Sequence, residues 1–336
     1  MHGARPRPGT DETHSQLLGH APILPNTVTA MWHRSRALPV TPRLGRVPEL
    51  PDDLVLPEGF APGPPAGGPV TPKDAASVVL LRDTACGPEA LLLRRAAGMA
   101  FAAGMTAFLG GGVDPRDADV SVGWTGPEPA WWARRFGCEA GLATALVCAA
   151  VRETFEEAGV LLAGPDAHSV VADTAAYGDA RRALETREIS LAQFLADAGL
   201  VLRADLLRPW ANWITPEEEV RRYDTRFFVA ALPDGQRADA VTREADDVAW
   251  RRPEDALADW KQGRRFLLPP TWTTLAELAK YRSVAEAMAA ERTITAIMPR
   301  VVRRGGVLRV VLPDDPEYDA AATHLDARPD DDLESR

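Results

Sequence analysis

The pattern of apolar residues predicts a β-hairpin at the start of the folded part of the chain, near Asp74. Two β-rich runs flank residues 84–88, TACGP, which have turn chemistry. A third apolar run leads into Gly110, Gly111 and Gly112, where a backbone without Cβ atoms can approach a ligand closely. The three expected strands are residues 76–82, 90–95 and 106–109.

A long apolar run over residues 143–151 predicts a helix that buries one side. The helix should continue through RETFEEA and end at Gly159, because glycine readily adopts the left-handed conformation that follows many helices. Before it lie Trp124, Trp131, Trp132 and Phe136. These aromatics are expected to pack a helical lid onto the body, in preference to stacking on a base.

The later elements are predicted from the same two signals, the periodicity of apolar residues and the residues that end helices or strands. Residues 170–200 should form two helices, the second capped by Ser190. The remaining expected elements are strands at 206–216 and 223–233, a short strand ending near Trp250, a helix starting at Pro253, a helix over about 272–289, and a hairpin of residues 294–302 and 307–312 turning at Gly305–Gly306.

These elements divide the chain into three parts. Residues 1–72 are rich in proline and show little periodicity, so they form an extension, disordered or draped over the domain. Residues 73–289 form the main domain, with insertions near 114–140 and 165–200. Residues 290–336 form a C-terminal extension with the hairpin and an acidic tail.

Composition narrows the class of protein. A chain of 336 residues with 46% hydrophobic residues can bury a substantial core, and its net charge of −10 argues against broad binding of nucleic acid or anionic membranes. The apolar runs are too short to span a bilayer. The cysteines Cys86, Cys138 and Cys148 show no zinc or disulfide spacing, so they are expected to be buried small residues in a reducing compartment. A cytoplasmic protein is the resulting expectation.

The predicted helix carries the clearest candidate chemistry. Glu153, Glu156 and Glu157, at i, i+3 and i+4, share one helix face. Such faces are commonly just solvated, but crowded carboxylates repel each other unless a cation compensates, and hard cations prefer oxygen ligands. The buried opposite side of the helix and the upstream glycines favour a site for Mg²⁺ or Mn²⁺.

The segment RETFEEAGV, residues 152–160, reads as REUXEEXGU with Thr154 in the first bulky apolar position. With FLGGG at residues 108–112, it resembles the Nudix box of hydrolases that cleave nucleoside diphosphates linked to another group. The long gap between the two halves, and phrases such as FxGGxxDxxD and RYDTRFF, are similar to the branch of peroxisomal coenzyme A diphosphatases. The resemblance implies an α/β/α sandwich around a mixed sheet, with a helical insertion inside the box.

The resemblance also implies roles for individual residues. Glu153 and Glu157 would bind the metal, with Glu156 a further ligand or an aid in positioning the water. Arg152 would hold the glutamate face in register, and the Gly111 carbonyl could be an additional ligand. Glu244 is the first choice for a general base, with Glu217, Glu218 and Glu219 competing. The expected substrate contacts are Arg94, Arg95, Gly110 and Gly111.

Some positions depart from the family pattern. Thr144 stands where the compact box has a glutamate, so that carboxylate is missing or is supplied by Glu139. Leu109 replaces the proline of FPGG. In the coenzyme A pattern, Leu93 replaces a threonine and Ala100 replaces an arginine that would contact phosphate.

The first functional hypothesis is therefore a Mg²⁺- or Mn²⁺-dependent diphosphatase of coenzyme A or acyl-coenzyme A. A second keeps the chemistry and changes the substrate to NADH, ADP-ribose, a nucleotide sugar or a dinucleoside polyphosphate. A third is a nucleotide sensor that does not hydrolyse. The partner expected in each case is a nucleotide-like small molecule, and the two extensions could serve formation of a homodimer.

Overall fold

The computed structural model describes residues 50–51, 54, 68–95, 104–119, 121–239, 245–304, 307–319 and 321. All of them belong to one compact unit, Arg36–Arg336. The expected N-terminal extension, residues 1–72, therefore lies almost entirely outside the described residues.

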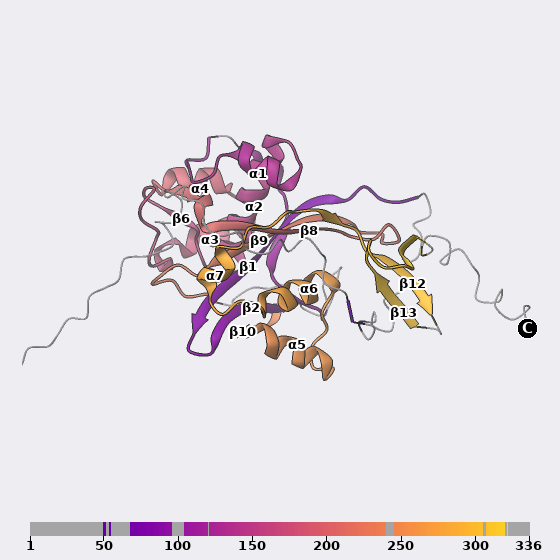
Figure 1. Ribbon diagram of the computed structural model, residues 1–336. Helices are drawn as coiled ribbons and strands as arrows, with labels where there is room; N and C mark the ends of the chain where they lie inside the picture. The colour runs from indigo at the N-terminus through magenta and orange to yellow at the C-terminus, as the bar shows by residue number, and fades with distance from the viewer. Residues whose placement is uncertain are drawn as a thin grey trace, which may run out of the picture. The chain divides into compact units, whose positions relative to one another are not determined.

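A mixed β-sheet forms the centre of this unit (Figure 1). Its strands follow the order β10-β2-β1-β9-β8-β11, with β3 added to β2 and β4 added to β1. The central pair β1–β9 is parallel, whereas β1–β2, β1–β4 and β8–β9 are antiparallel. The strands are β1 (Lys73–Thr84), β2 (Gly87–Arg95), β3 (Thr106–Ala107), β4 (Leu109–Gly112), β8 (Leu207–Ile214), β9 (Tyr223–Ala231), β10 (Ala245–Arg251) and β11 (Ala296–Ile297).

The first hairpin forms as predicted. Leu81 of β1 pairs with Ala90 of β2, and Thr84 pairs with Gly87 at the turn. Gly87 has a φ of +109°, which a residue with a side chain would rarely adopt. The turn chemistry in the sequence thus fixes the register of the two strands.

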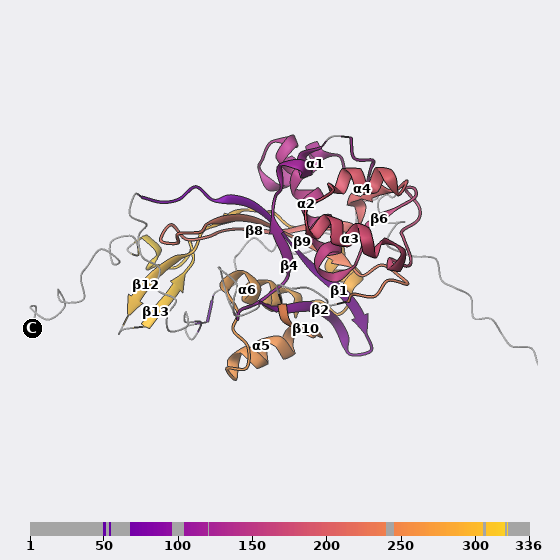
Figure 2. The same ribbon diagram turned by 180° about the vertical axis from the view of Figure 1, so that it is seen from behind.

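Helices cover both faces of the sheet (Figures 1 and 2). One core joins α1 (Pro129–Phe136) and α2 (Ala140–Ala158) to one sheet face through Leu146, Val147 and Phe228. A second core, on the other face, includes residues of the three helices that follow β10. These are α5 (Pro253–Lys261), α6 (Pro269–Leu278) and α7 (Val284–Met288). The α/β/α sandwich with a mixed sheet is confirmed.

Helix α2 is stabilised by burial of residues 143–151, which are apolar except for Thr144. The hydroxyls of Thr144 and Thr154 donate to the carbonyls of Ala140 and Ala150, so these buried polar groups are satisfied inside the helix. The helix ends at Gly159, whose φ of +67° is the left-handed C-terminal conformation expected from the sequence. The glutamate-bearing turn therefore sits at the end of a firmly buried helix.

The inserted segments pack onto the body. Trp132 is fully buried, with its ring 5.5 Å from that of Phe228 in β9, which confirms packing of this aromatic onto the body. In the second insertion, the Ser190 Oγ accepts from the backbone N–H of Gln193, as its predicted capping role requires. The elements of these segments are 3₁₀-helices η2 (Pro115–Ala118), η3 (Ala175–Tyr177) and η4 (Ala204–Leu206), helices α3 (Gly178–Glu185) and α4 (Leu191–Asp197), and the small sheet of β5 (Trp124–Thr125), β6 (Ala163–Gly164) and β7 (Val201–Arg203).

The predicted single helix over residues 272–289 is wrong. Helix α6 begins earlier, at Pro269, whose fixed φ suits a first helical position, and it ends at Leu278. A separate helix, α7, begins after Ser283, because the Ser283 Oγ accepts from the Glu286 N–H and caps a new helix.

The C-terminal hairpin pairs β12 (Arg300–Arg304) with β13 (Val307–Val311). Its turn at Gly305–Gly306 lies outside the described residues. Just before it, β11 adds to the main sheet beside β8, and the Tyr318 hydroxyl donates to the carbonyl of Met298. Structure tied to the main sheet therefore continues past residue 289.

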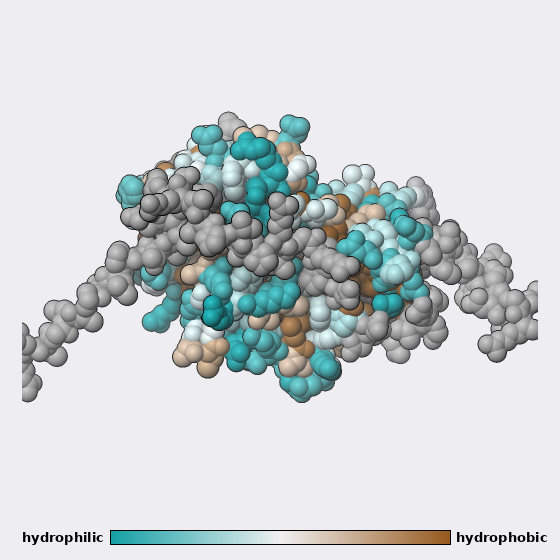
Figure 3. Space-filling view, viewed as in Figure 1, coloured by the Kyte–Doolittle hydropathy of each residue, from teal (hydrophilic) through white to brown (hydrophobic). Residues whose placement is uncertain are grey.

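No helix in the described part of the chain has the length and apolar character needed to cross a membrane. The surface seen in Figure 3 mixes hydrophilic and weakly polar residues, and its hydrophobic residues lie in separate small patches. The large hydrophobic side chains exposed among the described residues are Val70, Val220 and Phe266.

The three cysteines are free thiols, but only Cys148 is buried; Cys86 is exposed, because it lies in the hairpin turn. Burial raises the pKa of Cys148 to about 12, so little reactive thiolate forms at neutral pH. We expect iodoacetamide to label Cys86 in the native protein and Cys148 only after unfolding, as measured by peptide mass spectrometry. Rapid native labelling of Cys148 would contradict its position in the core.

Candidate active site

The glutamate-bearing turn of α2 and the glycine strand β4 line the same cavity, which has a volume of about 500 Å³. Glu153, Glu156 and Glu157 all line it, together with Gly110, Gly111 and Gly112. The side chains of Glu153 and Glu156 are each 13% exposed, so they are enclosed by protein while still facing the cavity. The structure thus places the three carboxylates together at the cavity, as their helical spacing predicts.

The glycines of β4 allow α2 to approach the strand closely. The Gly110 N–H donates to Oε2 of Glu157 at 2.7 Å. A Cβ on Gly111 would lie 2.5 Å from Oε1 of Glu153, closer than real Cβ atoms come. Gly110 has a φ of +147°, and a Cβ there would lie 2.3 Å from the Ala76 carbonyl oxygen. Only glycine fits these two positions without displacing the glutamates or β1.

Arg152 is fixed by a carboxylate from the first insertion. Its guanidinium donates two hydrogen bonds to Asp117, at 3.0 and 2.9 Å, and a third to the Gly112 carbonyl oxygen at 3.0 Å. The same group lies 2.6 Å from Oε1 of Glu153. Burial alone would lower the pKa of Arg152, but the bonds to Asp117 and the charge of Glu153 outweigh it and raise the pKa. Arg152 therefore remains a cation that links η2, β4 and α2.

The pKa of Glu156 is raised to about 7. Burial is the largest cause, the nearby negative charge of Glu153 is the next, and Arg152 opposes both. Like charges in a partly buried site destabilise each other, so the glutamate face favours a bound cation.

Carboxylate oxygens suit Mg²⁺ or Mn²⁺, and the crowded glutamates fit such an ion chemically. Among the described residues, however, no three acidic, histidine or cysteine side chains already stand together as a metal site. Arg152 contacts both Glu153 and Glu156 in this arrangement. Neither Thr144 nor Glu139 lines the cavity, so its lining favours the first of the two alternatives, a missing carboxylate, over supply by Glu139.

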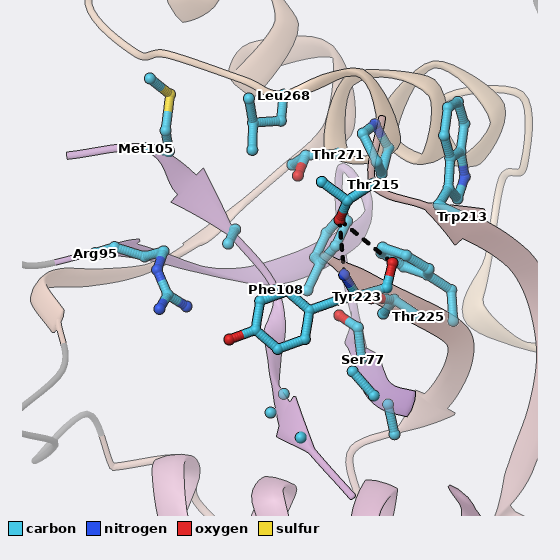
Figure 4. Close-up of a pocket in the computed structure, with 18 of the residues that line it drawn as sticks. Ser77, Arg95, Met105, Phe108, Trp213, Thr215, Tyr223, Thr225, Leu268 and Thr271 are labelled. Atoms are coloured by element: carbon cyan, nitrogen blue, oxygen red, sulfur yellow. Dashed lines mark hydrogen bonds between the residues drawn. The ribbon is translucent and has the colours of Figure 1, made fainter. Parts of the chain in front are cut away.

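The rest of the cavity is largely apolar. Its floor is the sheet face formed by β1, β8 and β9, and residues 268–271, at the start of α6, border it (Figure 4). Aromatic side chains lie along it, and the C-terminal hairpin segment adds a further wall. The aromatic residues are Phe108, Trp213, Tyr223 and Phe227, and the wall residues are Pro299, Val301 and Val310. One end is thus charged and the other suits an apolar group.

The structure separates the two arginines at the end of β2. Arg95 lines the glutamate cavity, and Figure 4 shows Arg95 and Tyr223 extending into it from opposite sides. Arg94 instead lines a second cavity with Arg251 and Asp255. Neighbouring residues of a strand point to opposite faces, which explains why the two arginines cannot both serve one anion.

Of the acids considered for a general base, Glu219 lines the cavity, whereas Glu217 and Glu218 do not. Burial and, to a smaller extent, the neighbouring Glu218 raise the pKa of Glu219. Glu244 lies outside the described residues.

Two further residues were not predicted as functional. Asp117, 3% exposed, holds Arg152, and its only sequence signal is the second aspartate of FxGGxxDxxD. Arg187, in the turn after α3, also lines the cavity. No local sequence signal marks it, because the contact depends on how the insertion folds back.

The chain is similar in sequence and fold to known proteins. Residues 133–278 match the sequence model described as the NUDT19 Nudix domain. The acyl-coenzyme A diphosphatase NUDT19 of Gallus gallus is 30% identical over 158 residues, which cover 41% of each chain. The putative nudix hydrolase 7 of Caenorhabditis elegans is 27% identical over 62% of this chain and 61% of its own. The chain therefore spans between about two fifths and three fifths of these relatives.

Among solved structures, a NUDIX hydrolase from Alicyclobacillus acidocaldarius superposes with a TM-score of 0.57 and 27% sequence identity. The match covers 67% of this chain and 98% of that one. The similarity thus covers almost the whole of that hydrolase.

Proposed function

We propose that this chain, which belongs to the Nudix hydrolase superfamily, hydrolyses the diphosphate link of a nucleotide-like substrate with the aid of a divalent metal ion. The observation that carries the proposal is the enclosed face of Glu153, Glu156 and Glu157, held against the glycine strand at the end of a cavity of about 500 Å³. Such a cavity has the size of a small-molecule site.

Glu153 and Glu157 would hold the metal, with Glu156 as a further ligand or as the group that orients the water. The Gly111 carbonyl is a candidate additional ligand. When bound, Mg²⁺ or Mn²⁺ supplies charge neutralisation at the phosphoryl oxygens and favours ionisation of water. Arg152 positions the glutamates through its bonds to Asp117 and Glu153 rather than contacting the reacting atoms.

Proton removal from the attacking water needs a nearby base. We propose Glu219 for this role in place of Glu244, because Glu219 lines the cavity and its pKa is raised, which makes it a stronger base than an ordinary carboxylate.

Coenzyme A or acyl-coenzyme A is the substrate we favour. The cavity combines a charged end, suited to a diphosphate, with an apolar end lined by Phe108, Trp213 and Val301. The relatives named acyl-coenzyme A diphosphatase support the same choice. The hairpin that carries Val301 lies outside the predicted 73–289 domain, so we propose that the catalytic unit extends beyond residue 289.

The test is product analysis by mass spectrometry after incubation with millimolar Mg²⁺ and separate samples of coenzyme A, NADH, ADP-ribose and a dinucleoside polyphosphate. Release of 4′-phosphopantetheine and adenosine 3′,5′-bisphosphate from coenzyme A is the expected result. Cleavage of another compound alone would keep the reaction and change the substrate. Metal-dependent binding without cleavage of any compound would favour a nucleotide sensor.

Replacing Gly111 by alanine should separate catalysis from folding. The added Cβ would meet the Glu153 carboxylate at 2.5 Å and displace it, so we expect kcat/KM to fall roughly a hundredfold with little change in melting temperature. Gly112→Ala is the matched control, because a Cβ there meets nothing within 4 Å. Equal activity of the two variants would show that the position of Glu153 does not matter.

A further inference from the structure

We propose that Arg187 binds the substrate's diphosphate at the metal end of the cavity, an inference that rests on the proposed function. Arg187 lies outside the Nudix motif, in the turn between α3 and α4. Arg187 lines the cavity together with Arg152, Glu153, Glu156 and Glu157.

Arg187 is the cavity arginine available to a ligand. Arg152 is committed to Asp117 and Glu153, and Arg95 already has an interaction within the protein. The Arg187 side chain is exposed, and within the described ranges no hydrogen bond or ion pair engages its guanidinium. A planar guanidinium with several donors suits bidentate binding of phosphate oxygens.

The negative charge of the cavity lining explains why binding of a diphosphate needs an additional cation. The cavity is lined by Glu153, Glu156, Glu157, Glu185 and Glu219, so its fixed charge repels an anionic substrate. A metal ion offsets part of this negative charge. A further cation beside the metal site is then needed to make the entry of a diphosphate favourable.

The backbone holds Arg187 in a conformation that arginine seldom adopts. Its φ of +60° makes it the only residue other than glycine with a left-handed backbone in the described part of the chain. Its N–H donates to the Leu184 carbonyl at the end of α3, and its carbonyl accepts from Nη1 of Arg116 at 3.1 Å. Glycine is the usual residue in such a helix-terminating position.

The same contacts connect Arg187 to the frame of the active site. Arg116 is held by Asp114 at 3.0 Å, and the Asp114 N–H donates to Asp117, the partner of Arg152. The turn of Arg187 and the glutamate face are therefore positioned by one hydrogen-bonded segment, η2. These hydrogen bonds hold the turn of Arg187 in a defined position.

Arg187→Gly tests the proposal, because glycine relieves the left-handed strain while removing the guanidinium. We expect KM for coenzyme A to rise roughly tenfold, kcat to change less than about threefold, and the salt dependence of KM to weaken. The melting temperature should stay equal or increase. Arg187→Lys should recover part of the affinity, since it restores the charge without the bidentate geometry.

The control is Arg182→Ala, in α3 just before the turn that carries Arg187, with a side chain 70% exposed and no place in the cavity lining. An unchanged KM in Arg187→Gly, or an equal rise in Arg182→Ala, would overturn the proposal. Calorimetric binding of coenzyme A without metal provides a second readout. If no panel compound is cleaved by the wild-type protein, the proposed function fails, while weaker coenzyme A binding by Arg187→Gly would still support the anion contact.

Discussion

Glu157→Gln should lower kcat on the order of a thousandfold. The carboxylate of Glu157 accepts the Gly110 N–H at 2.7 Å, which fixes one oxygen against β4 and leaves the group facing the cavity. Glutamine can still accept that hydrogen bond, but it lacks the negative charge that makes a carboxylate a strong ligand for a divalent metal. The measurement is steady-state hydrolysis of coenzyme A at several Mg²⁺ concentrations, together with calorimetric titration of Mn²⁺.

Stability should move in the opposite direction to activity in this variant. Removing one of the crowded charges relieves repulsion with the other glutamates, so the metal-free variant should melt at the same or a higher temperature. Glu185→Gln is the matched control, because Glu185 lines the same cavity from α3. Full activity of Glu157→Gln would exclude this residue as a metal ligand, and equal loss in Glu185→Gln would point to general electrostatics.

Much of the fold could be predicted because its signals are local. The TACGP turn set the register of the first hairpin, and Gly159 and Ser190 marked helix ends where the structure has them. The break between α6 and α7 was missed although Ser283, a good capping residue, was visible in the sequence. Residues 272–289 contain no glycine or proline, so the residues that usually interrupt a helix did not mark the break.

The glutamate face of the site could likewise be predicted, because i, i+3 and i+4 spacing on a helix determines which side chains share a face. The same kind of rule could have separated Arg94 from Arg95, since neighbours on a strand face opposite ways. Long-range contacts could not be predicted. Asp117 reaches Arg152 across 35 positions of sequence, and Arg187 enters the cavity through an insertion whose path no local pattern specifies.

Asp117→Ala should destabilise the protein by about 3–5 kcal/mol, because it leaves the Arg152 guanidinium without its principal partner in a mostly buried position. The side chains of Arg152 and Asp117 are 12% and 2% exposed, so water cannot replace the lost carboxylate fully. The substitution also removes the acceptor of the Asp114 N–H and so loosens η2. Urea unfolding monitored by tryptophan fluorescence measures the change in free energy.

Asp119→Ala is the control, because Asp119 is close in sequence but exposed, so its loss should leave stability nearly unchanged. Activity adds a second test of how Arg152 works. Freed from Asp117, the guanidinium should pair more closely with Glu153 and Glu156, which it already contacts, and compete with the metal for them. The Mg²⁺ concentration needed for half-maximal activity should therefore rise in Asp117→Ala, even at temperatures where the variant is folded. An unchanged metal requirement would mean that Asp117 stabilises the fold without positioning Arg152 for catalysis.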